Sequence, residues 1–161
     1  MAGARDLALL RALRTRGHTA AREAVIARFS RLGEQGMLWL GICAVGARVD
    51  REHRPTYARA ARTVVAVYGV NQVLKFAVRR PRPALEGLPP LAGTLSGLSY
   101  PSAHAATSFA AARMLSPALP AAPLYAVAVA LALSRPYLGL HYPSDIAAGA
   151  LLGLAVGSAA R

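Results

Sequence analysis

The stretch LSRPYLGLHYPSD, residues 133–145, lies between two of the most apolar parts of the chain. It carries Arg135, His141 and Asp145, and Asp145 is the only acidic residue that follows Glu86. Ionisable side chains are costly among apolar helices, and where they occur they usually mark function. The reason for keeping these three charged residues depends on where the other charged residues of the chain lie.

The composition combines strong apolarity with strong basic charge over 161 residues, a length that suits one domain. Hydrophobic residues make up 55% of the chain, and 19 Lys and Arg against 7 Asp and Glu give a formal charge of +12. This combination predicts a membrane protein with basic edges that face anionic lipid. Nucleic acid is the other usual partner of such a charge, but a nucleic-acid-binding module rarely needs so much apolar surface. The single cysteine, Cys43, excludes an intrachain disulfide.

The first 35 residues predict a basic amphipathic segment. Over residues 5–32, apolar side chains recur at helical spacing with arginines between them, and Gly17 interrupts the pattern. Such a segment can lie in the membrane interface, or it can pack on a core as an ordinary surface helix. We therefore expect two parts, an N-terminal amphipathic helical segment over residues 1–35 and a transmembrane helix bundle over residues 36–161.

Apolar stretches predict an all-α integral membrane bundle of about five short helices. A spanning helix needs ~20 apolar residues, and flanking arginines can extend shorter stretches by snorkelling. Gly149, Gly153 and Gly157 recur at a spacing of four, which suits close helix packing in lipid. A soluble all-α domain is the alternative. The predicted helices cover residues 36–47, 55–76, 102–116, 121–134 and 146–160.

Residues 83–100 are rich in Pro, Gly and Ser and show no period, which predicts an ordered loop or a lid. The motif KFAVRRPRP, residues 75–83, precedes this loop. Its prolines end the helix that carries Lys75. Lys75 and Arg79 therefore fall in the last turn of that helix, and Arg82 lies just beyond it.

A second motif, YPSAHAA over residues 100–106, follows the loop. Ser102 is a good N-cap, which places His104 in the first turn of the next helix. The YPSD that follows His141 repeats this device and places Asp145 in the first turn of the last helix. The N-terminus of a helix favours an anion. Two such helix ends and four cations on one side of the bundle predict a phosphate site, the cations being Lys75, Arg79, Arg82 and Arg135.

Hydrolysis of a phosphate ester needs a nucleophile and a proton donor, and His141 and His104 are available for these roles. Asp145, four residues beyond His141, can accept one ring N–H and expose the other nitrogen for attack. His104 can protonate the leaving oxygen. Taken singly, each histidine is more often a cap or a packing residue than a catalyst. The grouping of three charged clusters at helix ends favours the catalytic interpretation.

In their order and internal spacing, the motifs resemble the three-part signature of the type-2 phosphatidic acid phosphatase superfamily. The resemblance covers about residues 60–155. Ala103 stands where many members of the family have Gly, and both are small residues. The matching residues are Lys75-x6-Arg82-Pro83, Pro101-Ser102-x-His104 and Ser134-Arg135-x5-His141-x3-Asp145.

The resemblance implies a multi-pass enzyme of the cell membrane that uses neither metal nor cofactor. It implies that His141 attacks phosphorus to form a phosphohistidine, that Asp145 orients His141, and that His104 is the general acid. It further implies that phosphate oxygens are held by Lys75, Arg82, Ser102 and Arg135. Three neighbours are further candidates for the site, namely Arg79, Ala103 and Ser134.

Three stretches indicate a substrate within this family, a lipid phosphate in the bilayer. SRLGEQGMLWL (residues 30–40), GTLSGLSYPSAHA (93–105) and SRPYLGLHYPSD (134–145) are similar to small actinobacterial enzymes that dephosphorylate decaprenylphosphoryl-5-phosphoribose, a precursor of cell-wall arabinose. Undecaprenyl diphosphate and phosphatidylglycerophosphate are the alternative substrates. A catalytically silent lipid-binding scaffold and a nucleic-acid-binding protein are the non-enzymatic alternatives, and we expect no nucleic-acid partner. The arginine distribution decides neither the side of the membrane that the site faces nor the oligomeric state.

Overall fold

The computed structural model describes residues 3–161, which form seven α-helices, one 3-10 turn and no strand, only isolated bridges. The prediction of an all-α fold is therefore confirmed. Within this part of the chain, no helix is both long enough and apolar enough to cross a membrane. The elements are α1 (Ala4–Thr15), α2 (Ala20–Leu32), η1 (Glu34–Gly36), α3 (Met37–Val49), α4 (Arg54–Val78), α5 (Ala103–Leu115), α6 (Ala121–Tyr137) and α7 (Pro143–Ala159).

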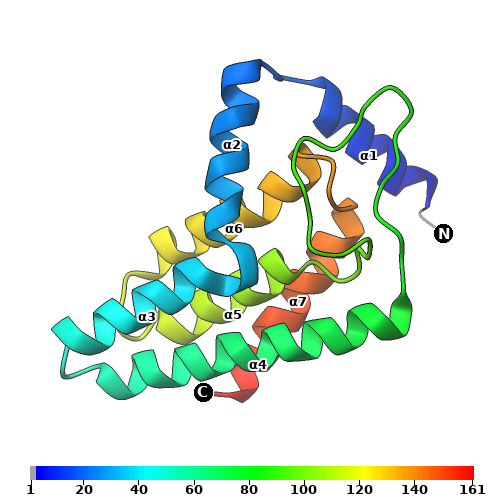
Figure 1. Cartoon of the computed structure of the whole chain (residues 1–161). Coiled ribbons are helices and arrows are strands. Elements are labelled where there is room, and N and C mark those ends of the chain that lie inside the picture. Colours follow the sequence, from blue (N-terminus) through cyan, green and yellow to red (C-terminus); the bar gives the residue numbers. More distant parts are fainter. Residues whose placement is uncertain (1–2) are drawn as a thin grey trace.

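Helix α5 is the centre of the bundle, and α3, α4, α6 and α7 all pack against it (Figure 1). Its buried positions are mostly alanine, which lets neighbouring helices approach closely. The approach is closest to α7, where a Cβ atom on Gly153 would strike the backbone carbonyl oxygen of Ala106. Gly149 meets the carbonyl of Ser102 in the same way. The glycine repeat of α7 thus packs directly on the backbone of α5, as its spacing predicts.

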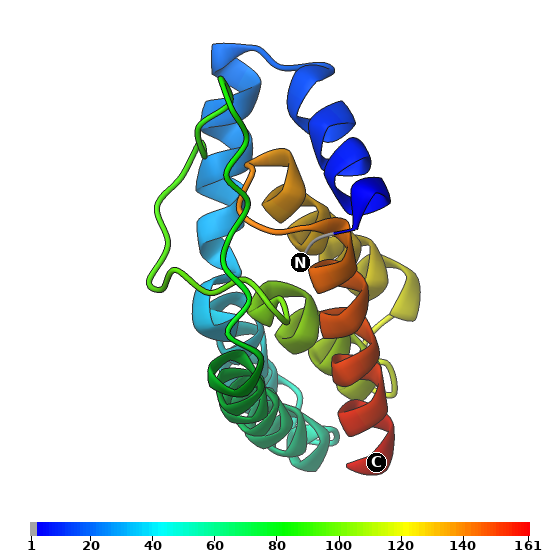
Figure 2. The ribbon, with the colours of Figure 1, turned by 90° about the vertical axis from the view of Figure 1, so that its right-hand side faces the viewer.

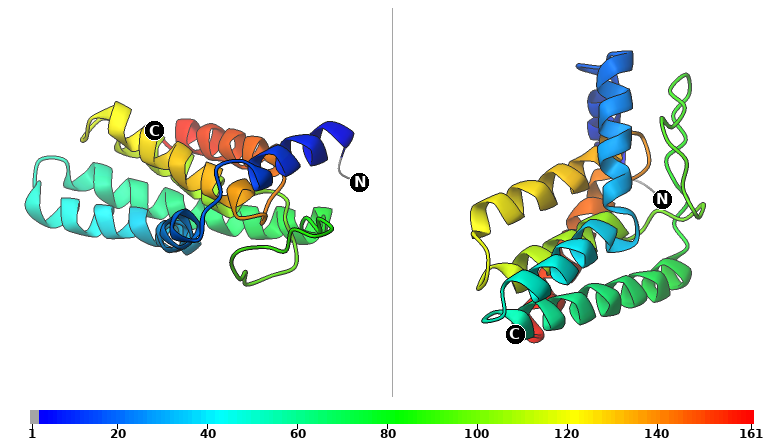
Figure 3. Two further views of the ribbon diagram at one scale, coloured as in Figure 1. Left: turned by 90° about the horizontal axis from the view of Figure 1, so that it is seen from above. Right: turned by 60° about the vertical axis from the view of Figure 1, so that its left-hand side comes forward.

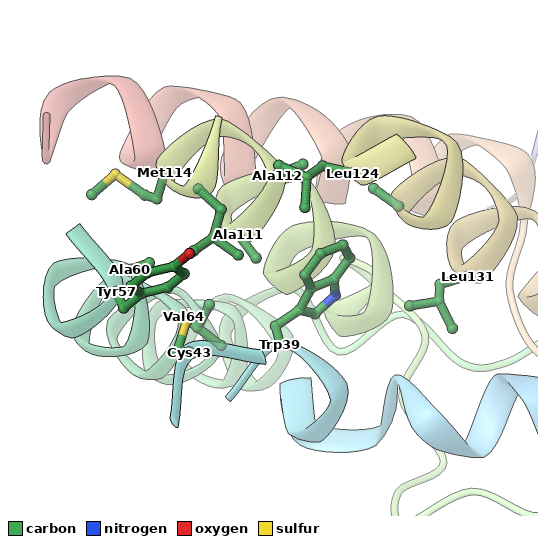
Figure 4. Close-up of a cluster of buried hydrophobic side chains, with 12 residues drawn as sticks. Trp39, Cys43, Tyr57, Ala60, Val64, Ala111, Ala112, Met114, Leu124 and Leu131 are labelled. Atoms are coloured by element: carbon green, nitrogen blue, oxygen red, sulfur yellow. The ribbon is translucent and has the colours of Figure 1, made fainter. Parts of the chain in front are cut away.

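Larger side chains fill the space between α3, α4, α5 and α6 (Figure 4). Trp39 of α3 is fully buried there, and its indole N–H donates to Ser108 Oγ on α5 at 2.9 Å. Tyr57 and Val64 of α4 and Leu131 of α6 belong to the same cluster. Because the one polar atom of the indole has a partner, the tryptophan adds apolar burial without an unpaired donor.

The N-terminal helices stand at one end of the bundle rather than along it, with α2 rising from the start of α3 (Figures 1 and 3). The chain breaks between them at Gly17, whose φ of 71° lies in the left-handed region that glycine tolerates best. Thr19 then caps α2 by accepting a hydrogen bond from the N–H of Arg22. Both the helical character of this segment and its break near Gly17 are confirmed.

A long loop joins α4 to α5 and turns up toward the level of α1 and α2 (Figures 1 and 3). Helix α4 ends at Val78, just ahead of the two prolines, as predicted. Backbone hydrogen bonds then order the loop, from Ser99 N to Arg80 O at 2.8 Å and from Leu91 N to Leu138 O at 3.0 Å. The second of these ties the loop to the turn between α6 and α7.

The glycine contact between α5 and α7 generates a stability prediction. Gly153→Ala should destabilise the protein by about 1–3 kcal/mol, because the added methyl group overpacks a backbone contact. Gly69→Ala in α4 is the matched control, since a Cβ atom there meets nothing within 4 Å. That control should be neutral or should stabilise by up to about 1 kcal/mol through helix propensity. Thermal unfolding of both purified variants checks this, and equal unfolding temperatures would contradict the packing described.

Candidate active site

The three motifs meet at a cavity of about 250 Å³ at the end of the bundle that carries the N-terminal helices. Its wall comes from η1, from one face of α4, from the loop before α5 and from the turn before α7. Six residues that the sequence singles out line it, namely Lys75, Arg82, Ala103, His104, Arg135 and His141. Residues separated by more than sixty positions in the chain thus share one small space.

His141 lies in the turn between α6 and α7, and its side chain is almost fully buried. Its Nε2 atom is 3.1 Å from Arg82 Nη1, and its Nδ1 atom is 3.5 Å from Asp145 Oδ2. A guanidinium can only donate, so Nε2 carries the lone pair and the ring proton sits on Nδ1, toward the carboxylate. Burial lowers the pKa of His141 to about 3, and the nearby charges of Arg82 and Arg135 act in the same direction, against the opposing effect of Asp145. The imidazole is therefore neutral at physiological pH, with Nε2 available as a nucleophile.

Asp145 sits in the first turn of α7, where the sequence predicts it, and is fully buried. Its Oδ2 atom accepts the N–H of Tyr142 at 2.9 Å, which closes a capping box at the start of the helix. Its Oδ1 atom accepts a hydrogen bond from Arg80 Nη1 at 2.7 Å. The carboxylate that faces His141 is therefore fixed from two sides. The second of its partners, Arg80, was not among the predicted site residues.

Two basic side chains of the cavity, Lys75 and Arg82, have backbone carbonyls as partners instead of carboxylates. Lys75 Nζ donates to the carbonyls of Leu98 and Pro101 at 3.2 and 3.4 Å. Arg82 donates from Nε to Ser96 O at 2.8 Å and from Nη1 to Leu140 O at 2.7 Å.

Within residues 3–161, no carboxylate forms an ion pair with Lys75, Arg82 or Arg135. Lys75 and Arg135 are nevertheless only 4% and 5% exposed. Buried charge without a counter-charge is costly. An anion that enters the cavity would compensate all three charges.

Ser30, at the end of α2, organises the far side of the cavity and was not among the predicted site residues. Its carbonyl accepts His104 Nε2–H at 2.9 Å, and its hydroxyl accepts Arg135 Nη1–H at 2.8 Å. The bond to the carbonyl leaves Nδ1 as the nitrogen of a neutral His104 that can take up and release a proton. Helix α2 thus sets the orientation of two side chains that the motifs supply.

Three other predicted residues lie away from the open part of the cavity. The hydroxyl of Ser134 is 2.9 Å from Ser30 Oγ and 2.7 Å from Leu131 O, so it supports the arrangement around Arg135. Ser102 is buried as the N-cap of α5, and its N–H donates to the backbone carbonyl of Asp145 at 3.0 Å. Arg79 is exposed at the C-cap of α4 and does not line this cavity.

Known proteins share both the sequence pattern and the fold of this chain. Residues 56–161 match the PAP2 superfamily. The chain is 38% identical over 130 residues to the decaprenylphosphoryl-5-phosphoribose phosphatase of Mycobacterium tuberculosis, a match that covers 80% of this chain and 73% of that protein. The matched family region contains all three motifs.

Solved structures extend the likeness to the whole fold. Aquifex aeolicus LpxE superposes with a TM-score of 0.77 at 24% identity, over 98% of this chain and 95% of the other. The transmembrane PAP2 type phosphatidylglycerolphosphate phosphatase of Bacillus subtilis superposes with a TM-score of 0.73 at 25% identity, over 97% and 82% of the two chains. At this coverage the N-terminal helices belong to the shared fold as well.

The position of Ser30 generates a prediction about anion binding. Ser30→Ala removes the hydroxyl that holds Arg135 but leaves the backbone carbonyl that holds His104. A hydrogen bond to a charged group is worth about 1.5–3 kcal/mol, so the inhibition constant of orthophosphate or orthovanadate should rise about tenfold or more.

Ser158→Ala is the control for that experiment, because its hydroxyl accepts a hydrogen bond from the half-buried Arg113 side chain at 3.1 Å, away from the cavity. The control should leave the inhibition constant unchanged. Equal inhibition constants for wild type and Ser30→Ala would show that α2 does not position the anion-binding side chains.

Proposed function

Because the chain belongs to the PAP2 superfamily and is a phosphoric monoester hydrolase, we propose that it removes the terminal phosphate of a polyprenyl-linked lipid through a phosphohistidine at His141. The observation that carries the proposal is the group of three basic side chains around His141 Nε2, none of them paired with a carboxylate in the described part of the chain. Such a site suits a phosphate dianion. Membership of this family favours an enzyme over a lipid-binding scaffold or a nucleic-acid-binding module.

The first step of the reaction forms the phosphoenzyme. His141 Nε2 attacks phosphorus while the bond from phosphorus to the ester oxygen breaks. His104, which takes up a proton at Nδ1 as the anionic substrate binds, gives that proton to the departing oxygen. Asp145 stabilises the positive charge that develops on the ring of His141. Arg82 Nη1 faces the attacking lone pair in the free protein at 3.1 Å, so a phosphate oxygen must take over that donor when substrate binds.

The second step returns the free enzyme. A water molecule attacks the phosphoryl group on His141, and His104, now neutral, accepts the proton of that water. The bond between Nε2 and phosphorus breaks and inorganic phosphate leaves. In both steps the positive charges of Lys75, Arg82 and Arg135 stabilise the negative charge on the phosphoryl oxygens.

The outer surface of the bundle supports a place in the membrane. Large apolar side chains are exposed on several helices, which is unusual for a surface in water. Together with the charge of +12, this surface favours contact with the acyl chains and anionic headgroups of a bilayer. We propose a multi-pass protein of the cell membrane. The exposed side chains include Met37, Val45, Val65, Val73, Phe76, Leu133 and Leu151.

The rim of the cavity supports a sugar-containing headgroup, as in decaprenylphosphoryl-5-phosphoribose. Glu34 and Gln35 line it from η1 and are exposed, and neither side chain forms a hydrogen bond with any of residues 3–161. Gln35 holds a left-handed φ of 52°, which costs energy for a residue other than glycine. A carboxylate beside the phosphate site accepts hydrogen bonds from ribose hydroxyls and repels a second phosphate. This favours a phosphoribosyl lipid over undecaprenyl diphosphate.

The nucleophile is tested by His141→Ala, which should abolish turnover of a lipid phosphate because the phosphohistidine cannot form. Asp145→Asn should retain a small residual rate, since the ring of His141 loses its charged partner. His53→Ala, in the turn before α4 and outside the motifs, is the matched control and should keep full activity. Release of inorganic phosphate from detergent-purified protein measures all three. Full-rate hydrolysis by His141→Ala would refute the assignment.

The substrate is tested by comparing Glu34→Ala with Glu52→Ala, a change of the same kind in the opposite turn. With Glu34→Ala, kcat/KM for decaprenylphosphoryl-5-phosphoribose should fall about tenfold through lost hydrogen bonds to hydroxyls. Its kcat/KM for phosphatidic acid, which offers no sugar hydroxyl, should stay within about twofold. The substrate assignment fails if both lipids are affected equally, or if undecaprenyl diphosphate is the better substrate of the wild type.

A further inference from the structure

We infer that helix α1 holds the catalytic pair of His141 and Asp145 in place through Asp6 and Arg80. Both would be positioning residues of the proposed phosphatase, since neither lines the cavity in which phosphate binds. The inference rests on the proposed function of His141. It gives the N-terminal segment a part in the reaction that its amphipathic pattern does not predict.

Arg80 connects α1 to the start of α7. Its Nη1 atom donates to Asp145 Oδ1 at 2.7 Å, and its Nη2 atom donates to Asp6 Oδ2 at 2.8 Å. The guanidinium also lies over the ring of Tyr142, 4.0 Å from the centroid, which fixes its plane. A single arginine thus joins a carboxylate of α1 to the carboxylate that faces His141.

Asp6 also binds the first turn of α7 directly. Its Oδ1 atom accepts the backbone N–H of Ser144 at 3.0 Å, and its Oδ2 atom accepts the hydroxyl of the same residue. Burial raises the pKa of Asp6, but the hydrogen bonds from Ser144 and Arg80 outweigh this and hold the pKa below its ordinary value of 3.8. Asp6 is therefore charged at neutral pH, beside a helix N-terminus that favours an anion.

Helix α1 makes a second contact with the surroundings of the site, through Arg14. Arg14, 4% exposed near the end of α1, donates from Nη2 to the carbonyl of Pro89 at 2.8 Å. That loop forms a hydrogen bond from Leu91 N to Leu138 O, in the turn that leads to His141. Helix α1 lies against α6 and α7 (Figure 2). One end of α1 therefore holds the start of α7, and the other end holds the loop that bonds the turn before His141.

The shared arginine fixes how the carboxylate of Asp145 faces His141. Without Asp6, Arg80 would lose the partner that holds its second nitrogen, and it would hold the carboxylate of Asp145 less firmly. Without Arg80, Asp145 would lose one of the two partners that fix its carboxylate. Either change should slow the chemical step and leave the binding of phosphate intact.

The experiment compares Asp6→Asn, Arg80→Met and the double variant with wild type on a lipid phosphate, and uses orthovanadate as the probe of the phosphate site. Asp6→Asn should lower kcat about five- to tenfold and Arg80→Met about thirtyfold or more, in line with lost charge-assisted hydrogen bonds. The double variant should be slower than Arg80→Met by less than the five- to tenfold loss of Asp6→Asn alone, because the two residues share the contact between Asp6 and Arg80. KM and the inhibition constant of orthovanadate should stay within about twofold of wild type, since the cavity cations are untouched. Asp6→Glu, which keeps the charge, should recover most of the activity.

Glu23→Gln is the matched control, because it removes another N-terminal carboxylate, paired with His18 at 3.0 Å in α2, away from Asp145. It should leave kcat unchanged. The inference is overturned if Asp6→Asn behaves like Glu23→Gln, if the losses of the two single variants multiply, or if kcat, KM and the vanadate constant change together with the folded fraction. A wild-type protein that hydrolyses no lipid phosphate would overturn the proposed function, and the inference with it.

Discussion

Three positive charges share one small cavity, and within residues 3–161 none of them forms an ion pair with a carboxylate. Much of the architecture around the site follows from that constraint. Lys75, Arg82 and Arg135 repel one another at close quarters, and none has a carboxylate partner among the described residues, so uncharged hydrogen-bond acceptors must hold each of them. Backbone carbonyls of the loop before α5, the carbonyl of Leu140 and the hydroxyl of Ser30 fill that role. The site is consequently preorganised for an anion, and the phosphate of the proposed substrate would supply the missing countercharge.

The rigid part of the bundle keeps these carbonyls in place. Helix α5 approaches α7 at backbone distance through the glycine repeat, and it brings the start of each helix to the same end of the molecule. The backbone bond from Ser102 N to Asp145 O at 3.0 Å links those two helix starts directly. The second and third motifs are thus held in register by packing that lies outside both of them.

Local signals in the sequence were enough to predict most of the helices and where the candidate site residues fall on them. Prolines mark the end of α4, Ser102 marks the start of α5, and the spacing of four from His141 to Asp145 places one beside the other. Ser30, Arg80 and Asp6 carry no such signal. Their partners lie between 64 and 138 positions away in the chain, and an isolated serine or aspartate in an amphipathic helix is indistinguishable from an ordinary surface residue. Arg79 and Arg80 are adjacent in the chain, but Arg79 takes a left-handed conformation at the end of α4, and it is Arg80 that bonds Asp145.

The central claim is that Nε2 of His141 attacks phosphorus while the cations hold its oxygens. The most direct measurement is to quench the enzyme with alkali during turnover of a lipid phosphate and to locate the phosphoryl group by mass spectrometry and phosphorus NMR. Our account predicts a phosphoryl group on His141, on Nε2, because Nδ1 carries the proton that faces Asp145. A phosphoryl group on Nδ1, on His104 or on any other residue would contradict the account.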